Sequence, residues 1–98
     1  MSDFDYHKLD NLIHSKVRLG IIAALVAAES VDFSFLKEKL DLTDGNLSVN
    51  MKKLEEAGYI KTKKTFIKHK PNTSYRITAK GKKAFDRYLE NLKKILDD

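Results

Sequence analysis

The stretch TDGNLSVNMKKLEEAGYI, residues 43–60, decides the fold of this 98-residue chain. Thr43 is a favourable helix N-cap, and Gly58 suits the left-handed backbone that follows a helix end. Between these two residues the apolar positions recur at i, i+4 and i+7, the spacing of one helix face: Leu47, Met51 and Leu54. The pattern predicts an amphipathic helix over about 43–57, with a polar and basic face opposite the apolar one.

Three helices are predicted before this one, each from a capping residue followed by apolar residues at helical spacing. We expect a short helix capped by Asp5 with Leu9, Leu12 and Ile13 on one face, a second from Ser15 to Ala28, and a third that opens at Asp32 or Ser34. A tight turn at residues 41–42 then leads into the helix over 43–57. Two helices joined by a tight turn indicate a helix-turn-helix.

β-branched and aromatic residues alternate with polar ones over residues 59–66 and 73–78, on both sides of KHKPN at 68–72. This alternation predicts a β-hairpin with a basic tip. Thr78 can cap a last helix over about 79–96, which carries a broad apolar stripe. We therefore expect one domain over residues 1–98, mainly α with a two-stranded β-hairpin wing: a winged helix-turn-helix with dimerisation helices at both ends.

The composition excludes several classes of function. The chain has no cysteine, so disulfides, thiolate catalysis and Cys-ligated zinc are excluded. It has no nucleophile motif, paired-carboxylate site or phosphate-binding loop, and we expect neither enzyme activity nor a cofactor. The longest apolar run, residues 21–28, is far shorter than the roughly 18–20 residues of a membrane span, so the sequence favours a cytoplasmic protein without a membrane partner.

Charge is distributed unevenly along the chain. Residues 1–60 hold seven Lys and Arg against ten Asp and Glu, whereas residues 61–83 hold nine basic residues and no acidic one. The second segment therefore more than accounts for the net charge of +5. Its expected partner is a polyanion, and double-stranded DNA fits a basic hairpin beside a helix-turn-helix. The alternative is a lysine-rich face that is only solvated.

Helical geometry predicts which side chains of the 43–57 helix point away from the core. The amides of Asn46 and Asn50 can pair with adenine, and Val49 can contact a thymine methyl. The predicted DNA contacts on this helix are Thr43, Gly45, Asn46, Ser48, Val49, Asn50, Lys52 and Lys53. The predicted contacts on the wing, to phosphates or the minor groove, are Lys63, Lys64, Lys68, Lys70, Asn72, Thr73 and Arg76. An ordinary exposed helix surface is the alternative, but the acidic residues of this helix lie only near its two ends.

His7, Asp10 and His14 fall at spacings of three and four residues. On one continuous helix they would share a face, as metal ligands can. Ser15 is expected to interrupt that helix, and exposed polar residues near a helix end explain the same pattern. We therefore predict no metal site.

The apolar stripe of the last helix has two explanations. It can pack on its own domain alone, or part of it can pair with the first helix of a second copy of the chain. A chain this short buries only a thin core, which favours association, and we predict a homodimer. The predicted interface residues are Phe4, Leu9, Phe85, Tyr88, Leu92 and Leu96.

Three segments resemble short winged-helix transcriptional regulators of the MarR/ArsR-like type: LTDGNLS at 42–48, LEEAGYI at 54–60 and SYRITAKG at 74–81. The resemblance extends from about Leu9 to Leu96. It implies a homodimeric DNA-binding regulator, usually a repressor, whose two recognition helices lie about one DNA turn apart, roughly 34–36 Å. Asn50 and Met51 stand where many ArsR-like members have His-Leu, and the metal-ligand sets of the sensing members are missing. The resemblance therefore does not extend to metal sensing.

A winged-helix module that binds an acidic protein is the rival prediction, because one fold serves both functions. Salt-dependent binding to duplex DNA distinguishes the two. The sequence names no small-molecule effector.

Overall fold

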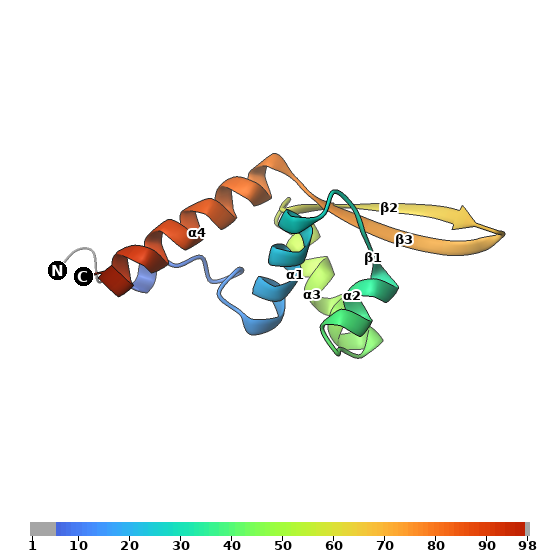
Figure 1. Cartoon of the computed structure of the whole chain (residues 1–98), viewed down its shortest axis with the longest axis horizontal. Coiled ribbons are helices and arrows are strands. Elements are labelled where there is room, and N and C mark those ends of the chain that lie inside the picture. Colours follow the sequence, from blue (N-terminus) through green and yellow to red (C-terminus); the bar gives the residue numbers. More distant parts are fainter. Residues whose placement is uncertain (1–5, 98) are drawn as a thin grey trace.

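Four α-helices and a three-stranded antiparallel sheet make up residues 6–97, the part of the chain that this computed structural model describes (Figure 1). The elements in chain order are the 3-10 helix η2 (Tyr6–Lys8), α1 (Lys16–Ala27), β1 (Val31–Asp32), α2 (Phe33–Lys39), α3 (Asp44–Glu56), β2 (Ile60–Ile67), β3 (Lys70–Ile77) and α4 (Ala79–Asp97). The molecule measures 57 × 25 × 21 Å, with α4 extending to one end and the β2–β3 ribbon to the other (Figure 1). The predicted mainly α fold with a hairpin wing is confirmed.

The apolar core lies between α1, α2, α3 and the root of the sheet. Its buried residues are Ile21, Ile22, Leu25, Val31, Leu36, Leu47, Met51, Leu54, Ile60 and Tyr75. The predicted inward face of α3 is confirmed, since all three of its apolar residues are buried. Burial of one such Leu or Ile stabilises the fold by about 1.5–3 kcal/mol, so this cluster fixes how α3 lies on α1 and the sheet. No helix within residues 6–97 is both long enough and apolar enough to cross a bilayer.

Three hydroxyl side chains cap helices at the predicted positions. Each accepts a hydrogen bond from the backbone N–H three residues further on: Ser15 at 3.4 Å, Thr43 at 3.1 Å and Thr78 at 3.0 Å. These caps satisfy N–H groups that the first turn of a helix leaves without a partner. The Thr78 hydroxyl also donates to the Gly58 carbonyl at 2.7 Å, so the start of α4 is tied to the end of α3.

Two glycines meet requirements that other residues would not. Gly58 has φ +79° directly after α3, which confirms the predicted helix end. Gly81 is buried in α4, where a Cβ would overlap the Tyr59 carbonyl and lie 2.8 Å from Cγ1 of Ile77. α4 therefore crosses the chain just after α3 at a distance that only glycine permits.

The wing is a regular hairpin with a two-residue turn. β2 and β3 pair along their whole length, from Ile60 opposite Ile77 to Ile67 opposite Lys70. Residues 68–69 form the turn, and both are left-handed, at φ +51° and +69°. The predicted five-residue tip is wrong, because two left-handed residues are enough to reverse the chain, and residues 70–72 belong to β3.

The sheet has a third strand that was not predicted. The sheet order is β1-β3-β2, and β1 pairs with β3 through Val31 opposite Tyr75 and Asp32 opposite Ser74. A strand of two residues is too short to show alternation, which explains why the pattern does not reveal it. β1 anchors the root of the wing between α1 and α2.

The predicted first helix is wrong. Only Tyr6–Lys8 forms a short 3-10 helix, and the Asp10 carboxylate then accepts hydrogen bonds from the N–H groups of Leu12 and Ile13, at 2.8 and 3.2 Å. This local side-chain bonding replaces the helical pattern with a turn. Ile13 is fully buried all the same. The cap predicted at Asp5 lies outside the described residues.

Candidate nucleic-acid interface

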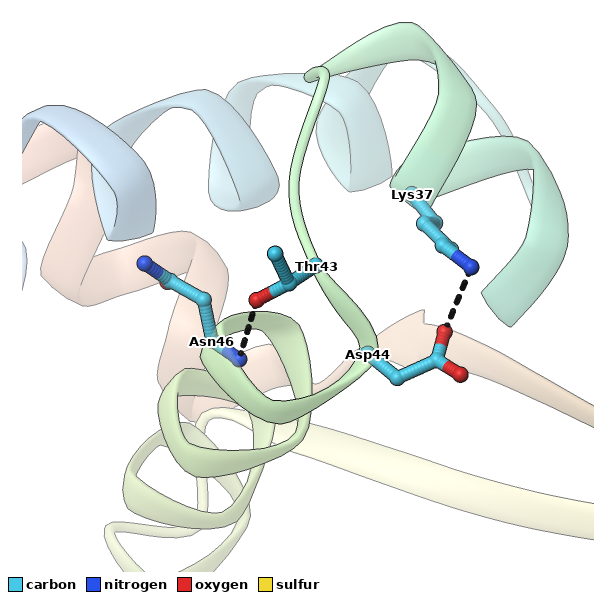
Figure 2. Close-up of polar contacts among 4 residues, drawn as sticks. All are labelled: Lys37, Thr43, Asp44 and Asn46. Carbon is cyan, nitrogen blue, oxygen red and sulfur yellow. Dashed lines mark hydrogen bonds and ion pairs between the residues drawn. The ribbon is translucent and has the colours of Figure 1, made fainter.

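α2 and α3 form the helix-turn-helix, and short-range contacts fix its turn. Asp41 is left-handed at φ +53°, and the N–H of Leu42 donates to the Lys37 carbonyl at 3.0 Å. Nζ of Lys37 lies 2.9 Å from the carboxylate of Asp44, across the turn, beside the cap at the start of α3 (Figure 2). Both side chains are exposed, so the ion pair adds less than about 1 kcal/mol and mainly helps to align the two helices.

The first turns of α3 present an exposed face. Seven of the eight contacts predicted on this helix are exposed: Thr43, Gly45, Asn46, Ser48, Val49, Lys52 and Lys53. Val49 is 55% exposed although its side chain is apolar, and a Cβ added at Gly45 meets no atom within 4 Å. The face combines amide, hydroxyl, methyl and ammonium groups, which suits base edges and phosphates.

Asn50, the eighth predicted contact, is engaged within the molecule. Its Oδ1 accepts a hydrogen bond from Nη1 of Arg18 at 2.8 Å. Its Nδ2 donates to both the carbonyl oxygen and the Oδ1 of Asn46, each at 2.8 Å. Both ends of the Asn50 amide therefore have partners, and one of those partners is the exposed amide of Asn46.

Arg18 of α1 is a residue that the sequence analysis missed. Its Nε donates to the Leu12 carbonyl at 2.5 Å, and its Nη1 reaches Asn50 on α3. Arg18, Asn50 and Asn46 form a continuous series of hydrogen bonds, the Arg18–Asn50–Asn46 chain, from α1 to the exposed face of α3. Arg18 and Asn50 are 32 positions apart, and no periodic pattern links them.

The strand register divides the predicted wing contacts between two faces of the ribbon. Directly paired residues share a face, and the faces alternate along each strand. The inner face, which includes the core residue Tyr75, carries the pairs Thr62–Tyr75, Lys64–Thr73 and Phe66–Pro71. The outer face carries Lys61–Arg76, Lys63–Ser74, Thr65–Asn72 and Ile67–Lys70. Lys64 and Thr73 therefore lie on the inner face, whereas Lys63, Asn72 and Arg76 lie on the outer face.

A shallow groove joins the inner face of the wing to α3. Ser48 and Lys52 of α3 line it together with Lys64 and Thr73 of the wing. At its root the Thr62 hydroxyl donates to the carboxylate of Glu55, the acidic residue of this groove. One continuous surface thus leads from the exposed helix to the basic ribbon.

The N-terminal segment, residues 6–15, contacts the parts of the fold that carry this surface. The Tyr59 hydroxyl donates to Oδ2 of Asp10 at 2.6 Å. Burial raises the pKa of Tyr59 to about 12, and the hydrogen bond to the Asp10 carboxylate and its negative charge act in the same direction. Nδ1 of His14 lies 2.8 Å from the Tyr88 hydroxyl. The segment therefore contacts both the start of β2 and α4.

The three residues with the spacing of metal ligands, His7, Asp10 and His14, have other partners within the molecule. Asp10 bonds to Tyr59, just before β2, His14 lies beside Tyr88 of α4, and the His7 ring lies next to that of Tyr6 at 4.2 Å between centroids. Residues 6–97 contain no group of three or more His, Asp or Glu side chains arranged to hold a metal ion.

The predicted interface residues occupy three different environments. Leu96 is 74% exposed, Leu9 and Leu92 are half-buried, and Phe85 is half-buried against the core cluster. Tyr88 is 3% exposed and meets His14 within the same chain. Phe4 lies outside the described residues. α4 also exposes Leu89, which the prediction did not include.

A helix-turn-helix with an exposed second helix beside a basic hairpin defines the class of winged-helix DNA-binding proteins. The family described as the winged helix DNA-binding domain matches residues 17–96, and the chain belongs to this family.

Relatives of the chain agree with this assignment. An uncharacterized protein of Methanocaldococcus jannaschii is 49% identical over 78 residues, which cover 80% of this chain and 85% of the relative. The solved structure of a transcriptional regulator homologue from Pyrococcus horikoshii matches with a TM-score of 0.88 and 34% identity, over 99% of this chain and 96% of the other. A MarR family regulator from Silicibacter pomeroyi shares the fold, with a TM-score of 0.64 and 19% identity over 88% of this chain and 57% of the other. The resemblance to short winged-helix transcriptional regulators is confirmed, and solved members of the MarR and ArsR families share the fold of this chain.

Proposed function

We propose that the protein binds double-stranded DNA sequence-specifically as a homodimer and represses transcription. The continuous surface from the exposed face of α3 to the inner face of the wing carries this proposal. It combines amide, hydroxyl and methyl groups of α3 with lysines of α3 and the wing.

Base reading is assigned to the start of α3 in the major groove. The Asn46 amide can pair with the N6 and N7 edge of adenine, and the exposed methyls of Val49 can contact a thymine methyl. We assign Asn50 and Arg18 a positioning role, because the Arg18–Asn50–Asn46 chain holds the amide of Asn46 in one orientation. A side chain held before binding loses less rotamer freedom when it pairs with a base.

Phosphate binding is assigned to lysines around the groove and at the wing tip. Lys52 and Lys64 flank the groove itself, and Lys68 and Lys70 stand at the tip of the ribbon. The outer-face residues Lys63 and Arg76 add to the positive field that attracts DNA. These groups supply affinity that does not depend on base sequence.

Dimerisation is assigned to α4. Its exposed Leu89 and Leu96, with the half-buried Leu92, form an apolar strip beyond the core cluster. Tyr88 and Phe85 support this strip from the inside. Leu9 extends the strip onto the N-terminal segment, which packs on α4 through η2.

The primary test is anisotropy titration of random duplexes, and of duplexes selected by the protein from a random pool, across a salt series. We expect steep salt dependence and tighter binding to the selected duplexes. Replacing Lys68 and Lys70 by Ala should weaken binding to both pools and lower the salt slope by up to about two. Asn46→Ala should cost roughly 1–3 kcal/mol on selected duplexes only. Absence of binding at low salt refutes the DNA proposal and favours the acidic-protein rival.

Repression is tested by transcription in vitro from a template with the selected site across its promoter. Added protein should reduce the transcript from this template and leave a template without the site unchanged. An increase in transcript refutes the repressor assignment while leaving sequence-specific binding intact.

A further inference from the structure

The far tip of the wing exposes two large apolar side chains that the core does not explain. Phe66 is 75% exposed and Ile67 is 54% exposed, and neither packs against the core cluster. They stand at the end of the ribbon that lies farthest from α4 (Figure 1). Exposed apolar groups at such a projecting position indicate a surface that contacts a partner.

The register directs the two side chains to opposite faces. Phe66 pairs with Pro71 on the inner face, two residues beyond the Lys64–Thr73 pair that lines the groove beside α3. Ile67 pairs with Lys70 on the outer face. Phe66 therefore extends the surface assigned to DNA, and Ile67 does not.

The charge around Phe66 indicates the chemistry of its partner. Lys64, Lys68 and Lys70 lie within four residues of it, and residues 61–83 contain no acidic residue. The partner must therefore offer an apolar contact between closely spaced negative charges. The minor groove of DNA has this character, because phosphates line its rims and sugars and base steps form its interior.

We propose that Phe66 is an apolar wedge that enters the minor groove next to the major groove occupied by α3. This proposal rests on the DNA-binding function proposed above. Lys64, on the same face, and Lys68, in the turn, bind phosphates at the rims of the groove while the ring lies against the sugars and partly separates one base step. Phenyl carbons form no hydrogen bond to a base edge, so the wedge reads how easily DNA deforms. It therefore favours flexible pyrimidine–purine steps, such as TA and CA.

The test uses duplexes with 2-aminopurine placed at successive steps of the flank that the wing reaches, in a sequence selected by the wild-type protein. Wild-type protein should raise 2-aminopurine fluorescence at one step, because unstacking relieves quenching. Phe66→Ala should abolish this rise and weaken binding about tenfold, because the apolar contact is lost. Phe66→Leu should retain most of the affinity. The salt slope of Phe66→Ala should equal that of wild type, since no charge is removed, whereas Lys68→Ala should lower it by about one.

Ile67→Ala is the matched control, because it removes a similar apolar group from the same tip on the opposite face. Equal losses of affinity in Phe66→Ala and Ile67→Ala, or a fluorescence rise that survives Phe66→Ala, overturn the wedge. Vesicles of phosphatidylglycerol test an anionic lipid surface as the partner. Loss of vesicle binding in Phe66→Ala with unchanged DNA binding also overturns the proposal. A wild-type protein that binds no DNA refutes the proposed function itself, whereas salt-dependent DNA binding that is unaffected by Phe66→Ala refutes only the wedge.

Discussion

Replacing Arg18 by Met removes the first link of the Arg18–Asn50–Asn46 chain while keeping the apolar stem of the side chain. The half-buried guanidinium donates two hydrogen bonds, to the Leu12 carbonyl at 2.5 Å and to Oδ1 of Asn50 at 2.8 Å. A hydrogen bond from a charged donor contributes roughly 1.5–3 kcal/mol, and water that reaches the half-buried acceptors after the change offsets part of this. We expect the free energy of unfolding to fall by about 2–4 kcal/mol for the two bonds together, measured by urea denaturation.

The same change should reduce base discrimination, because Asn50 then no longer holds Asn46 in one orientation. We expect binding to a selected duplex to weaken about tenfold, or about 1.4 kcal/mol, with a much smaller effect on random DNA. Arg87→Met on α4 is the control for the loss of one positive charge outside the helix-turn-helix. In the Asn46→Ala background, Arg18→Met should have little further effect on discrimination. Fully additive effects of the two changes on selected-duplex binding would refute the positioning role, whatever happens to stability.

Three further outcomes are expected. Gly81→Ala should lower the free energy of unfolding by about 1–3 kcal/mol or more, because the added Cβ meets backbone atoms. Gly45→Ala should cost far less, because its Cβ meets nothing within 4 Å. Urea denaturation of both variants measures the difference. The folded-state pKa of Tyr59, about 12, is above its ordinary value of 10.0, so its contribution to stability is complete below pH 10 and is lost as the pH rises towards 12. The difference in urea midpoint between wild type and Tyr59→Phe should shrink over this range, and a constant difference would contradict the shift. If the proposed dimer forms through α4, Leu89→Glu should sediment as a monomer in sedimentation velocity, whereas Val26→Glu, at a similarly exposed residue of α1, should not.

Features fixed by neighbouring residues could be predicted from the sequence. The caps at Ser15, Thr43 and Thr78 and the end of α3 at Gly58 depend on bonds or backbone angles within a few positions. The apolar face of α3 follows from helical spacing alone. These local signals were sufficient for the order of the main elements and for most of the exposed face of α3.

Features that depend on distant partners could not be predicted in this way. β1 forms only because residues more than 40 positions later pair with it. Arg18 of α1 donates a hydrogen bond to Asn50 of α3, which is 32 positions later. Which face each wing residue occupies depends on the length of the turn, since a shift of one residue moves every side chain to the other face. The sequence predicted a five-residue tip, whereas the turn has two residues. The sequence therefore could not place Lys63 and Arg76 on the outer face.

The turn at the wing tip has a consequence for the order in which the molecule folds. Lys68 and His69 both adopt left-handed backbone without the help of glycine, at a cost of roughly 1–2 kcal/mol each. The distal ribbon has exposed side chains and adds little core burial to offset this cost. Its amides should therefore exchange with solvent through local opening, well before those of α1 and α3, and the tip should form last during folding. The element that reaches farthest from the core is thus also the one that can change shape at the lowest cost.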